Sequence, residues 1–346
     1  MSQAPETTAA APLLTPKLKR RLGAGIAFGL VVYLAIAFYA DGPQILRALK
    51  RFPIRWVFVA CGLSFLNYCI RFLRWERYRA ILGIRMTRMT SFRIYLSGLA
   101  LTVTPGKMGE AFRSILIQRE DGTPIARSAP MVVAERFTDL LGFLILLAIG
   151  GIATQPEYVW VFWATLGLCG LLLVLASSRR VANLAIGVAG KTPLVRRIAG
   201  ELHHVFDSTR ELLAPRELFM PTFVSTLGWG LECYAFYLVS AALVPHGVTF
   251  LFAMYTFALS AILGAVLILF PGGLGITEAS MGTLLKREYI AVGVAADTAS
   301  AKALSVTFVI RLCTLWFAVA LGGLALFVHS LIERRRDRAS DAPAQS

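Results

Sequence analysis

Long apolar runs alternate with short charged segments along the 346 residues of the chain. Uncharged runs cover 22–40, 158–178, 233–270 and 312–332. A helix of about 18 or more apolar residues is long enough to cross the hydrocarbon core of a bilayer. The pattern therefore predicts an all-α, polytopic helical membrane protein.

Charged residues, proline and glycine divide the apolar runs into about six full spans and two interrupted helix hairpins, or about eight apolar segments in all. The expected spans are 22–40, 54–71, 125–152, 158–178, 218–244 and 297–330, and the expected hairpins are built from 94–110 and 250–290. The first hairpin is too short to cross and is expected to re-enter the side from which it came. The connection 71–93 is rich in arginine and is expected to lie outside the bilayer.

The remaining segments complete a single integral membrane domain over 17–332. Within it, 179–216 is basic and carries apolar residues at the spacing of one helical face, which predicts an amphipathic helix on the cytoplasmic surface. Residues 1–16 are expected to form a disordered cytoplasmic tail, and 333–346 a basic cytoplasmic tail.

Composition supports the bilayer as the solvent, since 57% of the residues are hydrophobic and the mean hydropathy is +0.66. The net charge of +15 could indicate nucleic acid. However, the basic residues gather at the ends of the apolar segments, so we expect no nucleic-acid partner. Basic clusters at 17–21 and 334–338 predict that both termini lie in the cytoplasm of a bacterial-type inner membrane. The basic segment 41–55, which should be external, fits this topology only as an interfacial helix.

The five cysteines all lie in apolar segments without the spacing of metal ligands, and we expect them to be buried packing residues. No motif for a metal or for another cofactor is found.

Helix-breaking residues occur at matching places in the two hairpins. The breaks contain Pro105, Gly106 and Gly109 in the first hairpin, and Pro271, Gly272, Gly273 and Gly275 in the second. Backbone groups freed by such breaks cannot face lipid, so they must line a polar cavity or be buried in protein. Because the two units start from opposite sides in this topology, we expect an inverted repeat with a site near the midplane, as in many transporters.

Ionisable residues inside apolar helices are the candidate site. Glu135, Arg136 and Asp139 lie within one span, where each charge costs on the order of 3 kcal/mol. They form either a self-neutralised structural cluster or a lipid-headgroup or proton-linked site. Lys107, Glu110 and Arg113 at the first break would suit a phosphate with a neighbouring amine or hydroxyl.

The later helices contribute further charges. Arg311 is isolated in its helix, and we expect its partner to be Glu278 or Glu232. Glu232 could be a packing partner or a part of the site. The group Asn67, Arg71, Arg74 and Trp75 is expected to consist mainly of ordinary interface anchors.

Four motifs in this order resemble the integral membrane region of lysylphosphatidylglycerol synthase, also called flippase-like proteins. They are "TPGKMGEAFR" (104–113), "AERFTDLLGF" (134–143), "FPGGLGITE" (270–278) and the late Arg311. The resemblance covers roughly 20–330 and implies a lipid flippase module. The soluble domain that carries the synthase activity of that family has no counterpart in the 14 residues after Ile332, so the chain is not expected to be an enzyme.

The hypothesis is a lipid translocator for a polar or anionic (glyco)phospholipid or isoprenoid-type lipid. The expected headgroup path contains Lys107, Glu110, Arg113, Glu135, Arg136, Asp139, Glu232, Glu278 and Arg311. Its partners would be membrane lipids with an anionic or polyprenyl-type headgroup and an envelope-lipid biosynthetic enzyme. The alternatives are a membrane-embedded lipid-modifying transferase and a non-transporting partner of an envelope-lipid synthase.

Overall fold

The computed structural model describes residues 42–50, 52–103, 108–151, 159–178, 199–266 and 273–340, together with position 157 and a few positions between 20 and 31. The expected first span and the expected N-terminal tail lie almost wholly outside these ranges, as do residues 179–198 of the amphipathic segment.

The described residues form helices and no strand, which confirms the all-α prediction. The elements are α2 (Gly42–Lys50), α3 (Arg55–Ile81), α4 (Arg88–Leu99), α5 (Met108–Asp121), α6 (Ile125–Ser128), α7 (Pro130–Gly151), α8 (Val159–Ser177), α11 (Ala199–Leu212), α12 (Pro215–Leu243), α13 (Phe250–Val266), α14 (Ile276–Ala291), α15 (Ala296–Arg311), the π-helical η4 (Leu312–Trp316) and α16 (Phe317–Ser340).

Among the helices that the structure describes, two are long and apolar enough to cross a bilayer. One is α3, and the other is the continuous helix Ala296–Glu333, which joins α15, η4 and α16. Val159–Leu175 and Phe250–Ala265 are shorter apolar helices. Large apolar side chains such as Phe58, Trp160 and Phe219 are exposed on the outside of the helices. Such an apolar exterior fits a protein whose surroundings are lipid.

The helix that contains the expected second span (54–71) extends beyond 71. Helix α3 continues without a break to Ile81, where Gly83 follows in the left-handed region with φ 70°. The helix continues because Arg71, Arg74 and Tyr78 are buried among other helices and do not face the membrane surface. The basic residues after 332 are likewise helical, since α16 reaches Ser340.

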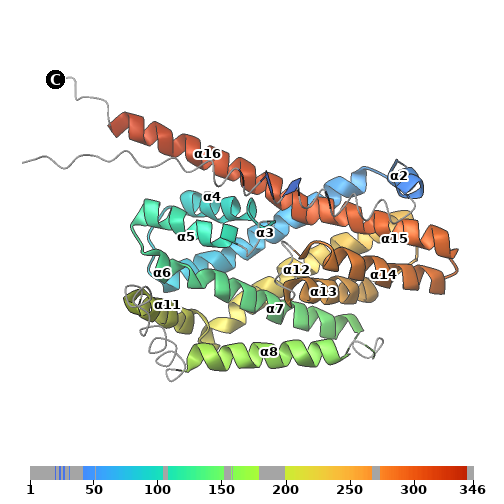
Figure 1. Ribbon diagram of the computed structural model, residues 1–346, viewed down its shortest axis with the longest axis horizontal. Coiled ribbons are helices and arrows are strands. Elements are labelled where there is room, and N and C mark those ends of the chain that lie inside the picture. Colours follow the sequence, from blue (N-terminus) through green and yellow to red (C-terminus); the bar gives the residue numbers. More distant parts are fainter. Residues whose placement is uncertain are drawn as a thin grey trace, which may run out of the picture.

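The described chain divides into two halves with the same order of elements. Each half has a long helix (α3 or α12), a hairpin (α4–α5 or α13–α14) and a further long helix (α7 or α15–α16). Figure 1 shows α3 running from the side of α2 towards α6, and α12 running in the opposite direction beside it. This antiparallel relation is the one that an inverted repeat requires.

Each hairpin packs against the long helix of the other half. Helix α4 lies on α16, and α13 lies on α7. Both crossings depend on a glycine: a Cβ added at Gly322 would lie 2.2 Å from the Ala100 nitrogen, and one added at Gly150 would lie 2.6 Å from the Tyr255 nitrogen. The hairpin of each half therefore packs on the last long helix of the other half through an equivalent close contact of the backbone.

The remaining helices, α8, α11 and α2, pack on the outside of the two halves. Helix α8 packs on α7, and α11 packs on α6, α7 and α8 (Figure 1). The amphipathic face expected in this segment buries Leu212 together with the following Leu213. Helix α2, in the basic segment that did not fit the predicted topology, packs on α15 and buries Ile45.

Candidate functional site

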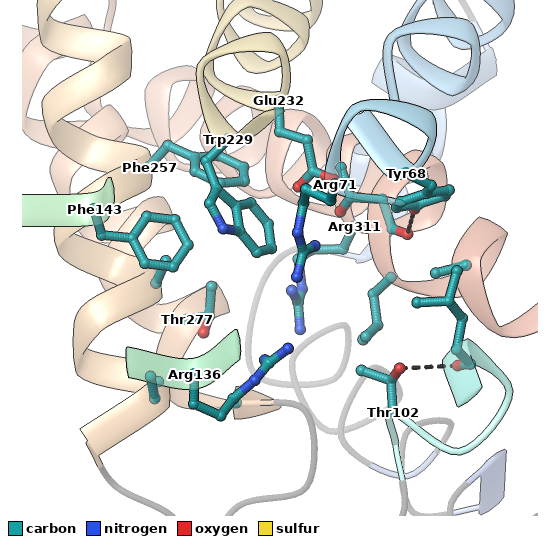
Figure 2. Close-up of a pocket in the computed structure, with 18 of the residues that line it drawn as sticks. Tyr68, Arg71, Thr102, Arg136, Phe143, Trp229, Glu232, Phe257, Thr277 and Arg311 are labelled. Carbon is teal, nitrogen blue, oxygen red and sulfur yellow. Dashed lines mark hydrogen bonds between the residues drawn. The ribbon is translucent and has the colours of Figure 1, made fainter. Parts of the chain in front are cut away.

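A cavity of about 170 Å³ lies between the two halves and is lined by four arginines. Arg71 comes from α3, Arg113 from α5, Arg136 from α7 and Arg311 from the end of α15. Figure 2 shows the side chains of Arg71, Arg136 and Arg311 directed towards a common space. Guanidinium groups of both halves thus converge on one cavity in the interior of the molecule.

The carboxylates that hold these arginines stand behind them and do not line the cavity. Asp139 is 3.0 Å from Arg71 Nη2, 2.7 Å from Arg74 Nη1 and 3.2 Å from Arg136 Nη2. The indole of Trp229 also donates to Asp139 Oδ1 at 2.9 Å. The buried carboxylate of Asp139 therefore positions two arginines that line the cavity, Arg71 and Arg136. It also holds Arg74, which does not line the cavity.

Glu135 has a similar role one turn earlier on α7. Its Oε2 is 2.7 Å from Arg113 Nη1, and its Oε1 is 3.7 Å from Arg74 Nη2. The alternative of a cluster neutralised within its own helix therefore holds only for Arg136 with Asp139. The described partners of Glu135 come from α5 and α3, so this acid ties three helices of the first half together.

In the second half, Arg311 Nε is 2.6 Å from Glu278 Oε1, which confirms one of the two partners expected for Arg311. The other oxygen of Glu278 accepts the backbone N–H of Gly275 at 2.6 Å and caps the start of α14. Gly275 has φ 90°, a conformation that glycine adopts without strain. The second break therefore places a carboxylate at a helix start, where it also holds an arginine of the cavity.

The interpretation of Arg71, Arg74 and Trp75 as interface anchors is wrong. The Arg74 side chain is 0% exposed, and its Nη1 donates to Asp139 Oδ1, to Thr138 Oγ1 at 3.1 Å and to the Ser225 hydroxyl. Trp75 is also buried, and its Nε1 donates to Ser91 Oγ at 2.9 Å. These side chains face the interior because their polar partners are there.

A signal in the sequence could have identified this face. Four buried polar residues in the second half of α3 are spaced at intervals of four, three and four positions, which is one stripe of an α-helix. They are Asn67, Arg71, Arg74 and Tyr78. A polar stripe on a helix of membrane-spanning length is expected to face a protein interior, since charges cannot face lipid.

Aromatic rings fix the positions of two cavity arginines. The guanidinium of Arg71 lies 4.5 Å from the ring centroid of Trp229, and that of Arg113 lies 4.9 Å from that of Tyr95. Cation–π contacts of this kind orient a guanidinium without neutralising its charge. Both arginines are thus held in place by rings as well as by carboxylates.

Glu232 is the one carboxylate among the described residues that line the cavity. Its side chain is buried, and its Oε1 accepts a hydrogen bond from Asn67 Nδ2 at 2.6 Å. Of the two possibilities left open for Glu232, a packing partner or a part of the site, this position favours the second.

The π-helical segment η4 begins directly after Arg311, and two of its residues, Thr314 and Leu315, line the cavity. The hydroxyl of Tyr68, another lining residue, donates to the Thr314 carbonyl at 2.8 Å, as the dashed line in Figure 2 marks. Isolated π-helical turns are frequent at functional sites, where they widen a helix locally.

Several expected site residues lie outside the residues that the structure describes. Pro105, Gly106, Lys107, Pro271 and Gly272 are not described, and for Gly109 and Glu110 the structure describes only the helical backbone of α5. The mixed-charge site expected at the first break is therefore described only for Arg113. Gly273 lines the cavity.

The five cysteines are free thiols. In the part of the chain that the structure describes, no group of three or more His, Cys, Asp or Glu side chains could hold a metal ion.

Comparison with known proteins gives two kinds of match. Residues 26–322 match the model of a family described as "Lysylphosphatidylglycerol synthase TM region". A UPF0104 membrane protein of Pyrococcus horikoshii is 23% identical over 327 residues, which cover 86% of this chain and 94% of that protein. A UPF0104 membrane protein of Methanothermobacter thermautotrophicus is 25% identical over 315 residues, which cover 86% of this chain and 90% of that protein.

Proposed function

The chain belongs to the multi-pass membrane protein family of the lysylphosphatidylglycerol synthase TM region, and from this premise we propose that it translocates lipids. The headgroup of an anionic lipid passes through the arginine cavity while the acyl chains stay in the surrounding lipid. The expected substrates are phospholipids, glycophospholipids or isoprenoid-type lipids that carry a phosphate.

The observation that carries this proposal is the position of the charged side chains, with positive groups at the cavity surface and most negative groups behind them. Arginines line it, whereas the carboxylates Glu135, Asp139 and Glu278 lie behind them. Around the cavity, the described residues supply five guanidinium groups and four carboxyl groups, which is a net charge of +1 when all are ionised. They are Arg71, Arg74, Arg113, Arg136 and Arg311, and Glu135, Asp139, Glu232 and Glu278. A net positive cavity inside a membrane protein favours an anion.

The chemistry of guanidinium suits a phosphate in particular. Its N–H groups form a planar fork that binds two phosphate oxygens at once, and it stays charged at any physiological pH. Carboxylates behind the arginines fix the direction of each fork in advance. Binding an anionic headgroup then costs little further ordering of the side chains.

The arrangement of the halves supports movement of the bound headgroup as well as its binding. The cavity takes arginines from both halves, and each half is packed on the hairpin of the other. In transporters with inverted repeats, such a site opens to one side or the other when the halves rock against each other. The same motion here would move a headgroup between leaflets.

The test is leaflet exchange in proteoliposomes. Phosphatidylglycerol with a fluorophore on its acyl chain is scored by an impermeant quencher, and phosphatidylcholine serves as the lipid without net charge. Arg136→Gln is the cavity variant, because its side chain is already 33% exposed. Arg77→Gln is the matched control, because Arg77 pairs with Glu217 outside the cavity lining.

We expect wild type to exchange phosphatidylglycerol faster than phosphatidylcholine. Losing one hydrogen bond to a charged group costs about 1.5–3 kcal/mol, so Arg136→Gln should slow exchange by about 10-fold or more. Arg77→Gln should match wild type. The proposal fails if wild type exchanges no lipid with a phosphate headgroup, or if Arg136→Gln and Arg77→Gln behave alike. Appearance of a chemically modified lipid in the vesicles would favour the transferase alternative.

A further inference from the structure

Glu232 differs from the other carboxylates of the cavity in its partner. Glu135, Asp139 and Glu278 each have an arginine within 3.2 Å. Glu232 has the neutral amide of Asn67, and within the described ranges no arginine or lysine lies within salt-bridge distance of it. Its second oxygen has no described partner, although Glu232 is only 3% exposed and lines the cavity.

The surroundings of Glu232 make it the group that can change its charge. From α3 it faces Tyr68 and Arg71, from α7 Asp139, from α15 Arg311, and on its own helix Cys233. Arginine stays protonated, and tyrosine and cysteine side chains are neutral at physiological pH. Asp139 is held as a carboxylate by three arginines. Among these groups, only Glu232 combines burial with a neutral hydrogen-bond partner and a place in the cavity lining.

We propose that Glu232 binds a proton together with the anionic headgroup, so that the protein is a proton-coupled carrier. This inference rests on the function proposed above. Protonation of Glu232 changes the net charge of the described groups around the cavity from +1 to +2. The anion then binds more tightly, and it leaves more readily when the proton leaves.

The charges balance over one cycle. One phosphodiester headgroup brings one negative charge, and one proton on the Glu232 carboxylate brings one positive charge. The loaded cavity therefore carries the same net charge as the empty cavity with Glu232 ionised. Translocation of the loaded form moves no net charge of the cargo and is independent of the membrane potential, whereas a proton gradient drives it.

Three variants separate this role from a structural one. Glu232→Gln keeps an acceptor for Asn67 but cannot titrate, and Glu232→Asp restores a titratable group. Glu217→Gln is the control, because Glu217 is an acid of the same helix that pairs with Arg77 outside the cavity lining. Folding of each variant is checked by its elution profile and thermal unfolding before any transport is measured.

The first measurement is exchange of phosphatidylglycerol in proteoliposomes from mildly alkaline to mildly acidic pH. Linkage to a single proton changes binding by at most about tenfold per pH unit. Wild type, Glu217→Gln and Glu232→Asp should bind and exchange the lipid better as the pH falls. Glu232→Gln should exchange it with no such dependence. An imposed membrane potential should change the rate of Glu232→Gln and leave that of wild type unchanged.

The second measurement needs no transport. Binding of short-chain phosphatidylglycerol in detergent is followed by calorimetry in buffers of different ionisation enthalpy. We expect wild type to take up close to one proton per headgroup over the range in which Glu232 titrates, and Glu232→Gln to take up none.

The outcomes distinguish the two proposals. Absence of exchange by wild type at every pH overturns the proposed function. Exchange by wild type that is independent of pH, or a pH dependence that survives in Glu232→Gln, overturns the proton-coupling role alone. If Glu232→Gln instead loses exchange of phosphatidylglycerol but retains that of phosphatidic acid, Glu232 recognises the headgroup hydroxyls and carries no proton.

Discussion

The two halves of the molecule hold their buried charges in different ways. In the first half, the two carboxylates of α7 hold four arginines in one network that joins three helices. In the second half, Glu278 holds Arg311, and Glu232 has an amide as its described hydrogen-bond partner. The first arrangement fixes positive charge in place, and the second leaves one acid free to change. The proposed proton-coupled carrier would require both features, fixed positive charge and an acid that can change its charge.

The largest expected effect is that of Asp139→Asn. This change leaves three arginines without their shared carboxylate, and breaking a buried ion pair costs about 3–5 kcal/mol. Unfolding of the purified variant in detergent, by heat or by denaturant, measures the loss. Glu217→Gln, which removes an ion pair with a half-exposed arginine, is the control and should cost no more than about 1 kcal/mol. Equal losses in the two variants would mean that the network does not stabilise the first half.

A smaller loss is expected for Glu278→Gln. The glutamine carbonyl can still accept the N–H of Gly275, so the change mainly removes the charge that Arg311 faces. A hydrogen bond to a charged group contributes about 1.5–3 kcal/mol. The same unfolding assay should therefore rank this variant between Asp139→Asn and Glu217→Gln. A loss larger than that of Asp139→Asn would reverse the comparison of the two halves.

Gly150 and Gly322 lie where α7 crosses α13 and where α16 crosses α4, and substitutions there test whether the two crossings are equivalent. Gly150→Ala and Gly322→Ala each place a methyl group less than 3 Å from the backbone of the opposite hairpin. Overpacking of this kind costs about 1–3 kcal/mol. The two variants should lose similar stability, whereas Gly230→Ala, whose nearest neighbour would be the Leu146 side chain at 3.9 Å, should not. A loss in only one of the two would show that the halves are not packed alike.

Local patterns in the sequence predicted the helical class and the order of the hairpins, and they limited the expected partner of Arg311 to Glu278 or Glu232, of which the structure shows Glu278. The choice could be limited to these two acids because Arg311 is an isolated charge in apolar surroundings, where it must find a partner. The inward face of α3 was missed because the partners of Arg71 and Arg74 on α7 are more than 60 positions away in the sequence. Arginine at the end of a long apolar helix has the same local appearance as an anchor at the membrane interface.

The order of charges around the cavity could not be predicted either. Glu135 and Arg136 are adjacent in the sequence, yet Arg136 lines the cavity and Glu135 lies behind it. Which of the two faces the cavity depends on the rotation of α7 against α3, α12 and α13, and that rotation is set by tertiary packing. A list of intramembrane charges in the sequence therefore names candidate residues but does not say which of them line the cavity.

The central claim is that the arginine cavity selects an anionic headgroup, and equilibrium binding of short-chain lipids to the purified protein tests it most directly. Phosphatidylglycerol should bind wild type and Arg77→Gln at least about tenfold more tightly than phosphatidylcholine, a difference of about 1.4 kcal/mol. Arg136→Gln should lose most of that preference. Equal affinity of wild type for the two lipids, or an unchanged preference in Arg136→Gln, would contradict the claim.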